Sequence, residues 1–175
     1  MNTDVQNYLQ QAKQFRQNND YNASLNILNQ AYNVCAKNDY ASLGKIYAFF
    51  GQIERDQQAL NKALLMYNKA LGEFRKISDN VKVTHTVRHI ADLHQALGQH
   101  HIAEENYQMV LTSYRKSEET AGLDLANALR GFALLQEGLG NNTAAKNAWT
   151  EARAIYLSAD IQAGVEECDG HLVKL

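Results

Sequence analysis

Proline is absent from this sequence of 175 residues, and glycine occurs only 10 times. Sandwiches and barrels of this size need many tight turns, and proline and glycine are the residues that make them. The scarcity of both argues against an all-β fold and favours an all-helical one. With 45% hydrophobic and 21% charged residues, the composition is that of an ordinary folded chain with one substantial core.

The sequence also lacks a long apolar run and an excess of either charge. Its net charge is −2, so nothing draws the chain as a whole to nucleic acid or to an anionic membrane. Every apolar run is far shorter than the roughly 18 residues that span a bilayer, and we expect no signal peptide. The two cysteines, Cys35 and Cys168, have neither metal-ligand spacing nor the density of a disulfide framework. We therefore expect reduced thiols in a cytoplasmic protein.

What the sequence does contain is a repeat of about forty residues. Four segments each place a small, a large and a small residue on one helical stripe. The last members of these stripes follow one another at steps of 39, 40 and 42 residues. The stripes are Ser24/Leu28/Ala31, Ala63/Tyr67/Ala70, Ala103/Tyr107/Val110 and Ala145/Trp149/Ala152.

Each stripe follows another apolar stretch with helical spacing, which predicts pairs of antiparallel helices. Gly98 and Gly140 fall between the helices of their pairs, with Asn19 and Gln58 at the equivalent positions, where a left-handed residue ends a helix. We predict four such pairs, in units of about residues 3–38, 39–78, 79–117 and 118–158, and a capping helix over 160–174. Short polar residues precede these helices as candidate caps, namely Asp20, Asp39, residues 78–80, Asn141 and Asp160.

This pattern resembles the tetratricopeptide repeat (TPR), whose units are usually about 34 residues long and therefore shorter than these. The resemblance extends from Val5 to Leu157. It implies one domain, residues 1–175, folded as a right-handed α-solenoid of four helix pairs with a C-terminal cap. It also implies a non-catalytic module that binds a protein or peptide partner. It rests on the pairs Phe50-Gly51, Ile90-Ala91 and Phe132-Ala133, on Gly98 and Gly140, and on the column Tyr67, Tyr107 and Trp149.

The histidines raise the alternative of a metal site or an enzyme. His85 and His89 stand four residues apart on one helix, a spacing that can hold a metal. However, no cysteine lies nearby, and the segment HTVRH lacks the glutamate of the metalloprotease motif. His94 falls in an apolar stripe, so we interpret it as a core histidine. No nucleophile motif or phosphate loop occurs, and we predict no catalysis, no cofactor and no metal.

In a TPR-like architecture the first helix of each pair lines a concave surface. Of the sixteen positions that we assign to this surface, six are Lys or Arg and two are acidic, which gives +4 against −6 for the rest of the chain. Arg88 and Arg130 occupy equivalent positions and should project side by side. Converging cations of this kind attract carboxylates or phosphates. The residues predicted to contact an acidic peptide or a C-terminal carboxylate are Lys13, Arg16, Lys45, Gln52, Arg55, His85, Arg88, Asp92, Arg130 and Leu134.

A second hypothesis is a self-associating scaffold, in which the convex or end surfaces form a homodimer and the groove stays empty. A third is a metal-dependent or hydrolytic enzyme built around His85 and His89. The sequence predicts neither a nucleic-acid nor a membrane partner, because its charge and its apolar runs suit neither.

Overall fold

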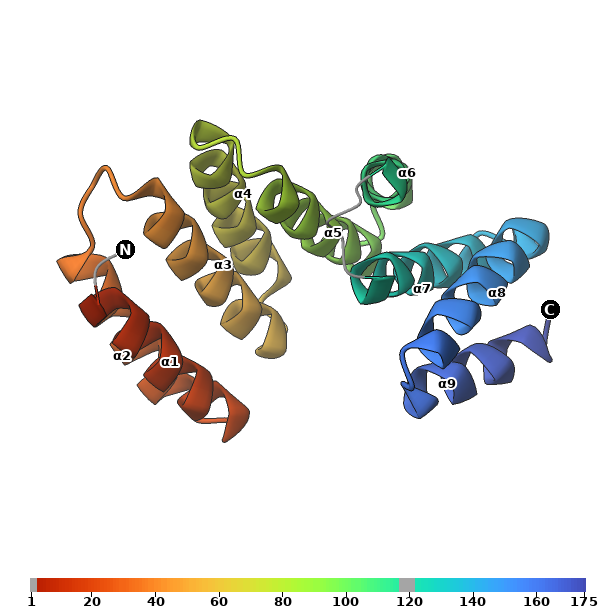
Figure 1. Ribbon diagram of the computed structural model, residues 1–175, viewed down its shortest axis with the longest axis horizontal. Helices are drawn as coiled ribbons and strands as arrows, with labels where there is room; N and C mark the ends of the chain where they lie inside the picture. The colour runs from red at the N-terminus through yellow and green to blue at the C-terminus, as the bar shows by residue number, and fades with distance from the viewer. Residues whose placement is uncertain (1–2, 117–121) are drawn as a thin grey trace. The chain divides into compact units, whose positions relative to one another are not determined.

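The computed structural model describes residues 3–116 and 122–175, and every regular element in them is an α-helix (Figure 1). Nine helices occur in these residues, which confirms the predicted all-α fold. Their bounds are α1 (Thr3–Gln17), α2 (Tyr21–Val34), α3 (Tyr40–Asp56), α4 (Leu60–Lys76), α5 (Asn80–Ala96), α6 (His100–Lys116), α7 (Gly122–Gly138), α8 (Asn142–Ser158) and α9 (Gln162–Leu172).

The chain divides by its packing into two compact units, Met1–Thr86 and Val87–Leu175, and the division falls inside α5. The first unit therefore holds α1 to α4 and the start of α5, and the second holds the rest of α5 and α6 to α9. The single domain inferred from the repeats stays a prediction. The predicted boundary between the third and fourth repeats, at residues 117 and 118, lies outside the described residues.

In the first unit, α2 packs on α1, α3 on α2 and α4 on α3. Small residues of the stripes let the helices approach closely. Ser24 is an example: it is fully buried, and its hydroxyl donates a hydrogen bond to the carbonyl oxygen of Ala12 at 2.7 Å. Two clusters of fully buried apolar residues hold α1, α2 and α3 together. They are Val5, Ala31 and Ile46, and Ala12, Leu28 and Ile53.

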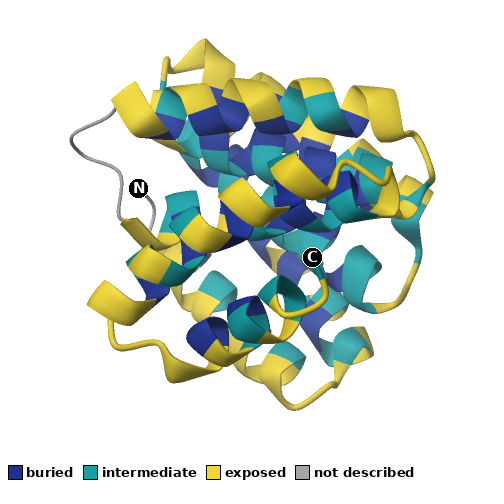
Figure 2. Cartoon of the chain, turned by 90° about the vertical axis from the view of Figure 1, so that its right-hand side faces the viewer, coloured by how far each residue is buried: buried dark blue, intermediate teal, exposed yellow. Residues whose placement is uncertain are grey.

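In the second unit, α7 packs on α6, α8 on α7 and α9 on α8. Tyr107 lies in a buried cluster with Ala91, Ala103 and Leu135, and Phe132 packs against it. Figure 2 shows the pattern along single helices, with buried residues on one side and exposed residues on the other. All twelve stripe residues are buried, none of them more than 1% exposed, as the repeat predicted.

The turns between paired helices contain the left-handed residues that the repeat predicted. Gly98 and Gly140 have φ of 73° and 76°, and Asn19 and Gln58 have φ of 59° and 61°. Two further residues without that prediction, Ser78 and Asp160, have φ of 53° and 56°. These six turns therefore use the same backbone conformation, whether or not glycine supplies it cheaply.

The predicted caps are confirmed in the first unit and partly wrong in the second. Asp20 and Asp39 each accept a hydrogen bond, at 3.0 Å, from the backbone N–H three residues later. Asn141 precedes α8 but caps no amide, because its side chain donates to Gln136 at 2.8 Å instead. Asp160 takes the left-handed conformation that ends α8, and the N-cap position of α9 is occupied by Ile161, which makes no side-chain cap hydrogen bond.

Some helical glycines lie against aromatic rings and others meet no neighbour. We therefore expect glycine-to-alanine substitutions to have opposite effects on stability in α3 and α4. A Cβ on Gly51 would lie 2.8 Å from the ring of the fully buried Tyr67, whereas a Cβ on Gly72 would meet nothing within 4 Å. We expect Gly51→Ala to destabilise the fold by about 1–3 kcal/mol through overpacking. We expect Gly72→Ala to stabilise it by about 0.5–1 kcal/mol, because alanine is the better helix former. Urea denaturation followed by circular dichroism measures both, and equal effects would contradict the packing at Gly51.

Candidate functional site: the inner faces of the two units

The odd-numbered helices of each unit hold the residues that the sequence assigned to a concave surface, which we name the inner face. In the first unit, Arg16 of α1 reaches α3, where its Nε lies 2.6 Å from the carboxylate of Asp56. Its Nη1 donates to Gln52 at 3.2 Å. Arg55 approaches the same carboxylate at 3.9 Å. The structure thus brings three predicted residues together around Asp56, an acidic residue that the sequence interpretation missed.

The remaining predicted residues of the first unit are Lys13, Lys45 and His85. Lys13 is exposed on α1, and Lys45 and His85 are half-buried and interact within the chain. Four of the predicted residues in the first unit are cations (Lys13, Arg16, Lys45 and Arg55). Asp56 lies beside Arg16 and Arg55, and the charge of Lys45 contributes to lowering the pKa of Asp39 and of Asp79.

The inner face of the second unit contains a half-buried network around Asp92. The carboxylate of Asp92 accepts from Arg88 at 3.1 Å and from the hydroxyl of Tyr107 at 2.7 Å. Tyr107 comes from α6 and also lies 3.0 Å from Gln95. Arg88 contacts the ring of His89 at 3.0 Å. The Arg88 side chain is only 13% exposed, so most of its charge is directed into the protein.

The ionisation of this network follows from its burial and its partners. Burial opposes the charged form of Asp92, but hydrogen bonding with His89, the charge of Arg88 and the hydroxyl of Tyr107 outweigh it and lower the pKa of the carboxyl group. Burial, and then the neighbouring charge of Asp92, raise the pKa of Tyr107 well above its usual range. Tyr107 is therefore a fixed neutral donor, and Asp92 is a fixed negative acceptor.

Arg130 of α7 forms a bidentate pair with a carboxylate. Its Nε and Nη2 each donate to a different carboxylate oxygen of Glu167 in α9, both at 2.6 Å. The two side chains are 42% and 32% exposed. Hydrogen bonding with Glu167 is the main cause that raises the pKa of Arg130, and Arg130 is the main cause that lowers the pKa of Glu167.

The predicted proximity of Arg88 and Arg130 has electrostatic support, because both charges act on Tyr107 and partly offset the effect of its burial on its pKa. Leu134, the apolar member of the predicted set, is half-buried on α7. In the second unit, Arg88 and Arg130 are each paired with a carboxylate, that of Asp92 and that of Glu167. Among the sixteen predicted positions the excess of four cations therefore lies in the first unit, because Asp92 and Glu137 balance Arg88 and Arg130 in number.

The histidines take other positions than the sequence interpretation gave them. His89 is the core histidine, 6% exposed and in contact with Arg88 and Asp92. His94 is half-buried, and its Nδ1 pairs with Gln99 in the adjoining turn, so the prediction of a core role for His94 was wrong. The apolar stripe did not predict that His89 is buried, because α5 buries a wider arc of its surface than the stripe covers. Among residues 3–116 and 122–175, no group of three or more His, Cys, Asp or Glu side chains is placed to hold a metal ion.

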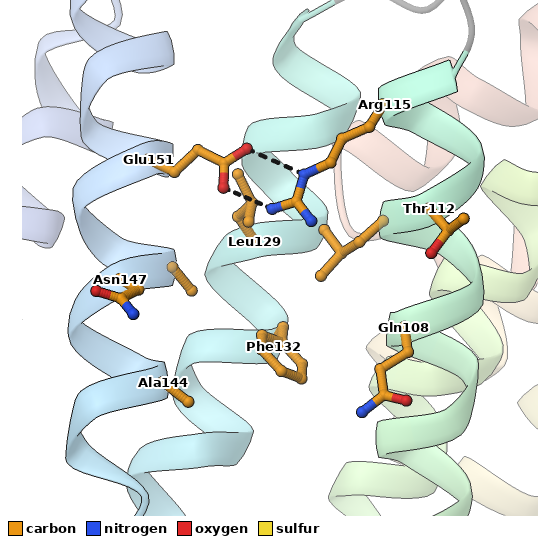
Figure 3. A pocket seen from close by; sticks show the side chains of 10 residues that line it. Gln108, Thr112, Arg115, Leu129, Phe132, Ala144, Asn147 and Glu151 are labelled. Atoms are coloured by element: carbon orange, nitrogen blue, oxygen red, sulfur yellow. Dashed lines mark hydrogen bonds and ion pairs between the residues drawn. The ribbon is translucent and has the colours of Figure 1, made fainter.

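A second surface lies on the even-numbered helices and was not predicted. Between α6 and α8 lies a hollow of about 500 Å³ with α7 as its floor (Figure 3). Phe132 and Leu129 point into it from α7, and Arg115 and Glu151 face each other across it. Their closest contact is 2.6 Å.

The first unit has a corresponding hollow of about 480 Å³ between α2 and α4, with Phe50 and Tyr47 of α3 at the positions of Phe132 and Leu129. Here Lys69 lies 5.5 Å from the centre of the Tyr47 ring, so a cation–π contact stands where the other hollow has an ion pair. Burial is the main cause that raises the pKa of Tyr47 to about 12, which keeps its hydroxyl neutral. No described helix is long and apolar enough to cross a membrane.

Comparisons with known proteins identify the repeat. A family model of the tetratricopeptide repeat matches residues 83–158. No curated protein matches the sequence. The match confirms the resemblance inferred from the stripe residues over the third and fourth units.

Two solved structures extend the likeness to nearly the whole chain. The crystal structure of BtubC (BKLC) from P. vanneervenii is similar with a TM-score of 0.75 and 18% identity, over 93% of this chain and 72% of that one. The nearly identical TPR-like repeats of a putative kinesin light chain from Podosopora anserina give a TM-score of 0.57 and 14% identity, over 99% and 96% of the two chains. At these identities the likeness shows the fold, that of a TPR-like helical repeat protein.

Proposed function

We propose that this chain, whose residues 83–158 are tetratricopeptide repeats, is a non-catalytic interaction module whose inner face binds an acidic segment of a partner protein. Folds of this kind generally mediate contacts between proteins, and that much of the function follows from the repeat. The choice of the inner face and of an acidic partner is our inference from charge. We place the module in the cytoplasm, in keeping with its two free cysteines, Cys35 and Cys168.

The observation that carries the proposal is the set of four cations, Lys13, Arg16, Lys45 and Arg55, that the first unit contributes to the inner face, in a chain whose net charge is −2. Lys13 is exposed, and Arg16 and Arg55 lie together beside Asp56. Such a cluster steers an acidic ligand toward it and orients it on arrival.

The ten predicted residues then have different roles. Lys13, Arg16, Lys45 and Arg55 would supply the attraction. Gln52, beside Arg16, and His85 would offer polar contacts. Leu134 would offer an apolar contact. Arg88 and Asp92 would shape the second unit rather than meet the ligand, because their charges already satisfy each other at 3.1 Å. Arg130 is considered separately below.

The test compares two charge reversals of equal size in the first unit. Lys13→Glu with Arg55→Glu changes the inner face, and Lys37→Glu with Lys62→Glu changes exposed lysines away from it. Both double variants lower the net charge by 4. The probe is a labelled twelve-residue peptide rich in glutamate, with a glutamine-rich peptide of the same length as the neutral reference, and binding is measured by fluorescence anisotropy at two salt concentrations.

We expect the wild type and the Lys37/Lys62 variant to bind the acidic peptide alike, and the Lys13/Arg55 variant to lose about tenfold or more in affinity, which corresponds to about 1.4 kcal/mol. Binding should weaken as salt rises. Equal losses in both variants would reduce the effect to net charge and overturn the assignment to the inner face. Light scattering at several concentrations addresses self-association, and a constant monomer mass would remove the homodimer as the use of these surfaces.

A further inference from the structure

The last helix is attached to the rest of its unit by a small buried face and by contacts between charged or titratable side chains. Only three of its residues, Gly164, Val165 and Cys168, are buried, and all three are small or medium-sized. Three acid–base contacts complete the attachment of α9. They are Glu167 with Arg130 of α7 at 2.6 Å, Asp169 with Arg153 of α8 at 2.5 Å, and His171 with Glu137 of α7 at 2.9 Å.

The contact between Glu167 and Arg130 has the geometry of a bound ligand. The guanidinium presents two N–H groups in parallel to the two oxygens of one carboxylate, which is the arrangement arginine uses to hold carboxylates in recognition sites. Both side chains are more than 30% exposed, so solvent and solutes reach the pair. Arg130 also stands at the inner-face position that is equivalent to Arg88.

We propose that Arg130 is a carboxylate-binding subsite, which Glu167 of α9 occupies in the free protein and from which a carboxylate of the acidic partner displaces it. This inference rests on the proposed function, because it assumes the same acidic class of partner. The exchange replaces one carboxylate by another, so the guanidinium stays paired at each end of the reaction. Glu167 then lowers the apparent affinity for the ligand by the fraction of time that it occupies the subsite.

The molecule contains a built-in reporter for this exchange. Trp149, the single tryptophan, is fully buried on α8 and stacks on the ring of His171 of α9, with 4.3 Å between ring centres and 15° between planes. Its indole N–H donates to Glu137, the same carboxylate that His171 contacts. Movement of α9 away from α7 changes this stack, and with it the fluorescence of Trp149.

The experiment uses two matched variants of the full chain. Glu167→Gln and Asp169→Asn each remove one arginine–carboxylate pair that attaches α9, and each keeps the size of the side chain. Only Glu167→Gln frees an arginine of the inner face, because the partner of Asp169 is Arg153 of α8. The same glutamate-rich peptide is titrated into both variants, into the wild type and into Arg130→Gln.

We expect Glu167→Gln to bind the peptide about fivefold tighter or more than the wild type, a size typical of coupled sites. Asp169→Asn should stay within about twofold of the wild type, and Arg130→Gln should bind more weakly. Saturating peptide should shift Trp149 emission in the wild type and leave it unchanged in Arg130→Gln.

The failures of the two proposals are distinguishable. If the wild type binds through Lys13 and Arg55 but Glu167→Gln has the same affinity as the wild type, the exchange is overturned and the proposed function stands. An equal gain in Asp169→Asn also overturns the exchange, because it traces the effect to general loosening of α9. No preference for the acidic over the neutral peptide in any variant overturns both.

Discussion

Asp92→Asn is expected to lower the free energy of unfolding at neutral pH by about 3 kcal/mol, because it leaves a buried cation without its counter-charge. The Arg88 side chain is 13% exposed, its Nη1 lies 3.1 Å from the carboxylate of Asp92, and its Nε has no hydrogen-bond partner among the described residues. Asp92 also accepts the Tyr107 hydroxyl at 2.7 Å. Urea denaturation followed by circular dichroism measures the loss.

The pH dependence provides a second measurement on the same variant. The pKa of Asp92 is lowered in the folded protein, so its carboxylate stabilises the fold above the unfolded pKa, about 3.9. That contribution is lost as the pH falls through the lower, folded-state pKa. The difference between wild type and Asp92→Asn should therefore be constant at neutral pH and shrink at acidic pH. A difference that is the same at pH 7 and pH 3 would contradict the assignment.

Asp169→Asn is the matched control, because it removes another aspartate–arginine pair from the same unit. Its partner Arg153 is 37% exposed and Asp169 is 48% exposed, so solvent screens the pair. Exposed pairs contribute between zero and about 1 kcal/mol. A loss in Asp169→Asn as large as that in Asp92→Asn would mean that burial of Arg88 is not the cause.

Trp149→Ala is expected to destabilise the protein by about 3–5 kcal/mol, the usual cost of removing a buried tryptophan. Trp149 has the largest fully buried side chain in the described chain. Its ring connects three helices, because it belongs to α8, donates to Glu137 of α7 and stacks on His171 of α9. Its removal therefore leaves a cavity and also weakens the attachment of α9.

Circular dichroism during urea denaturation is the measurement, since the variant has no tryptophan left to report by fluorescence. The neighbouring Thr150→Ala is the control, because Thr150 is exposed and its hydroxyl bonds only to the backbone of its own helix, at Lys146. We expect a change within about 0.5 kcal/mol for it. A loss below about 1 kcal/mol in Trp149→Ala would contradict the central position of this residue.

The sequence predicted the helices, the repeat and the buried stripes because these depend on local spacing. A small–large–small stripe with steps of four and three can be buried only by a helix, and Tyr67, Tyr107 and Trp149 are all at most 1% exposed. The turns at Gln58 and Gly98 were also predictable, since the repeat aligns them whichever residue fills the position. These features need no knowledge of how one helix pair meets the next.

Tertiary structure decided which charges meet. Arg16 pairs with Asp56, and Arg130 with Glu167, across 40 and 37 residues of sequence, about one repeat in each case. A helix pattern gives the face on which an arginine lies but not the reach of its side chain toward the next helix of that face. The sequence therefore determined the repeat and the positions of its cations, and only the packing of alternate helices decided that Arg16 pairs with Asp56 and Arg130 with Glu167.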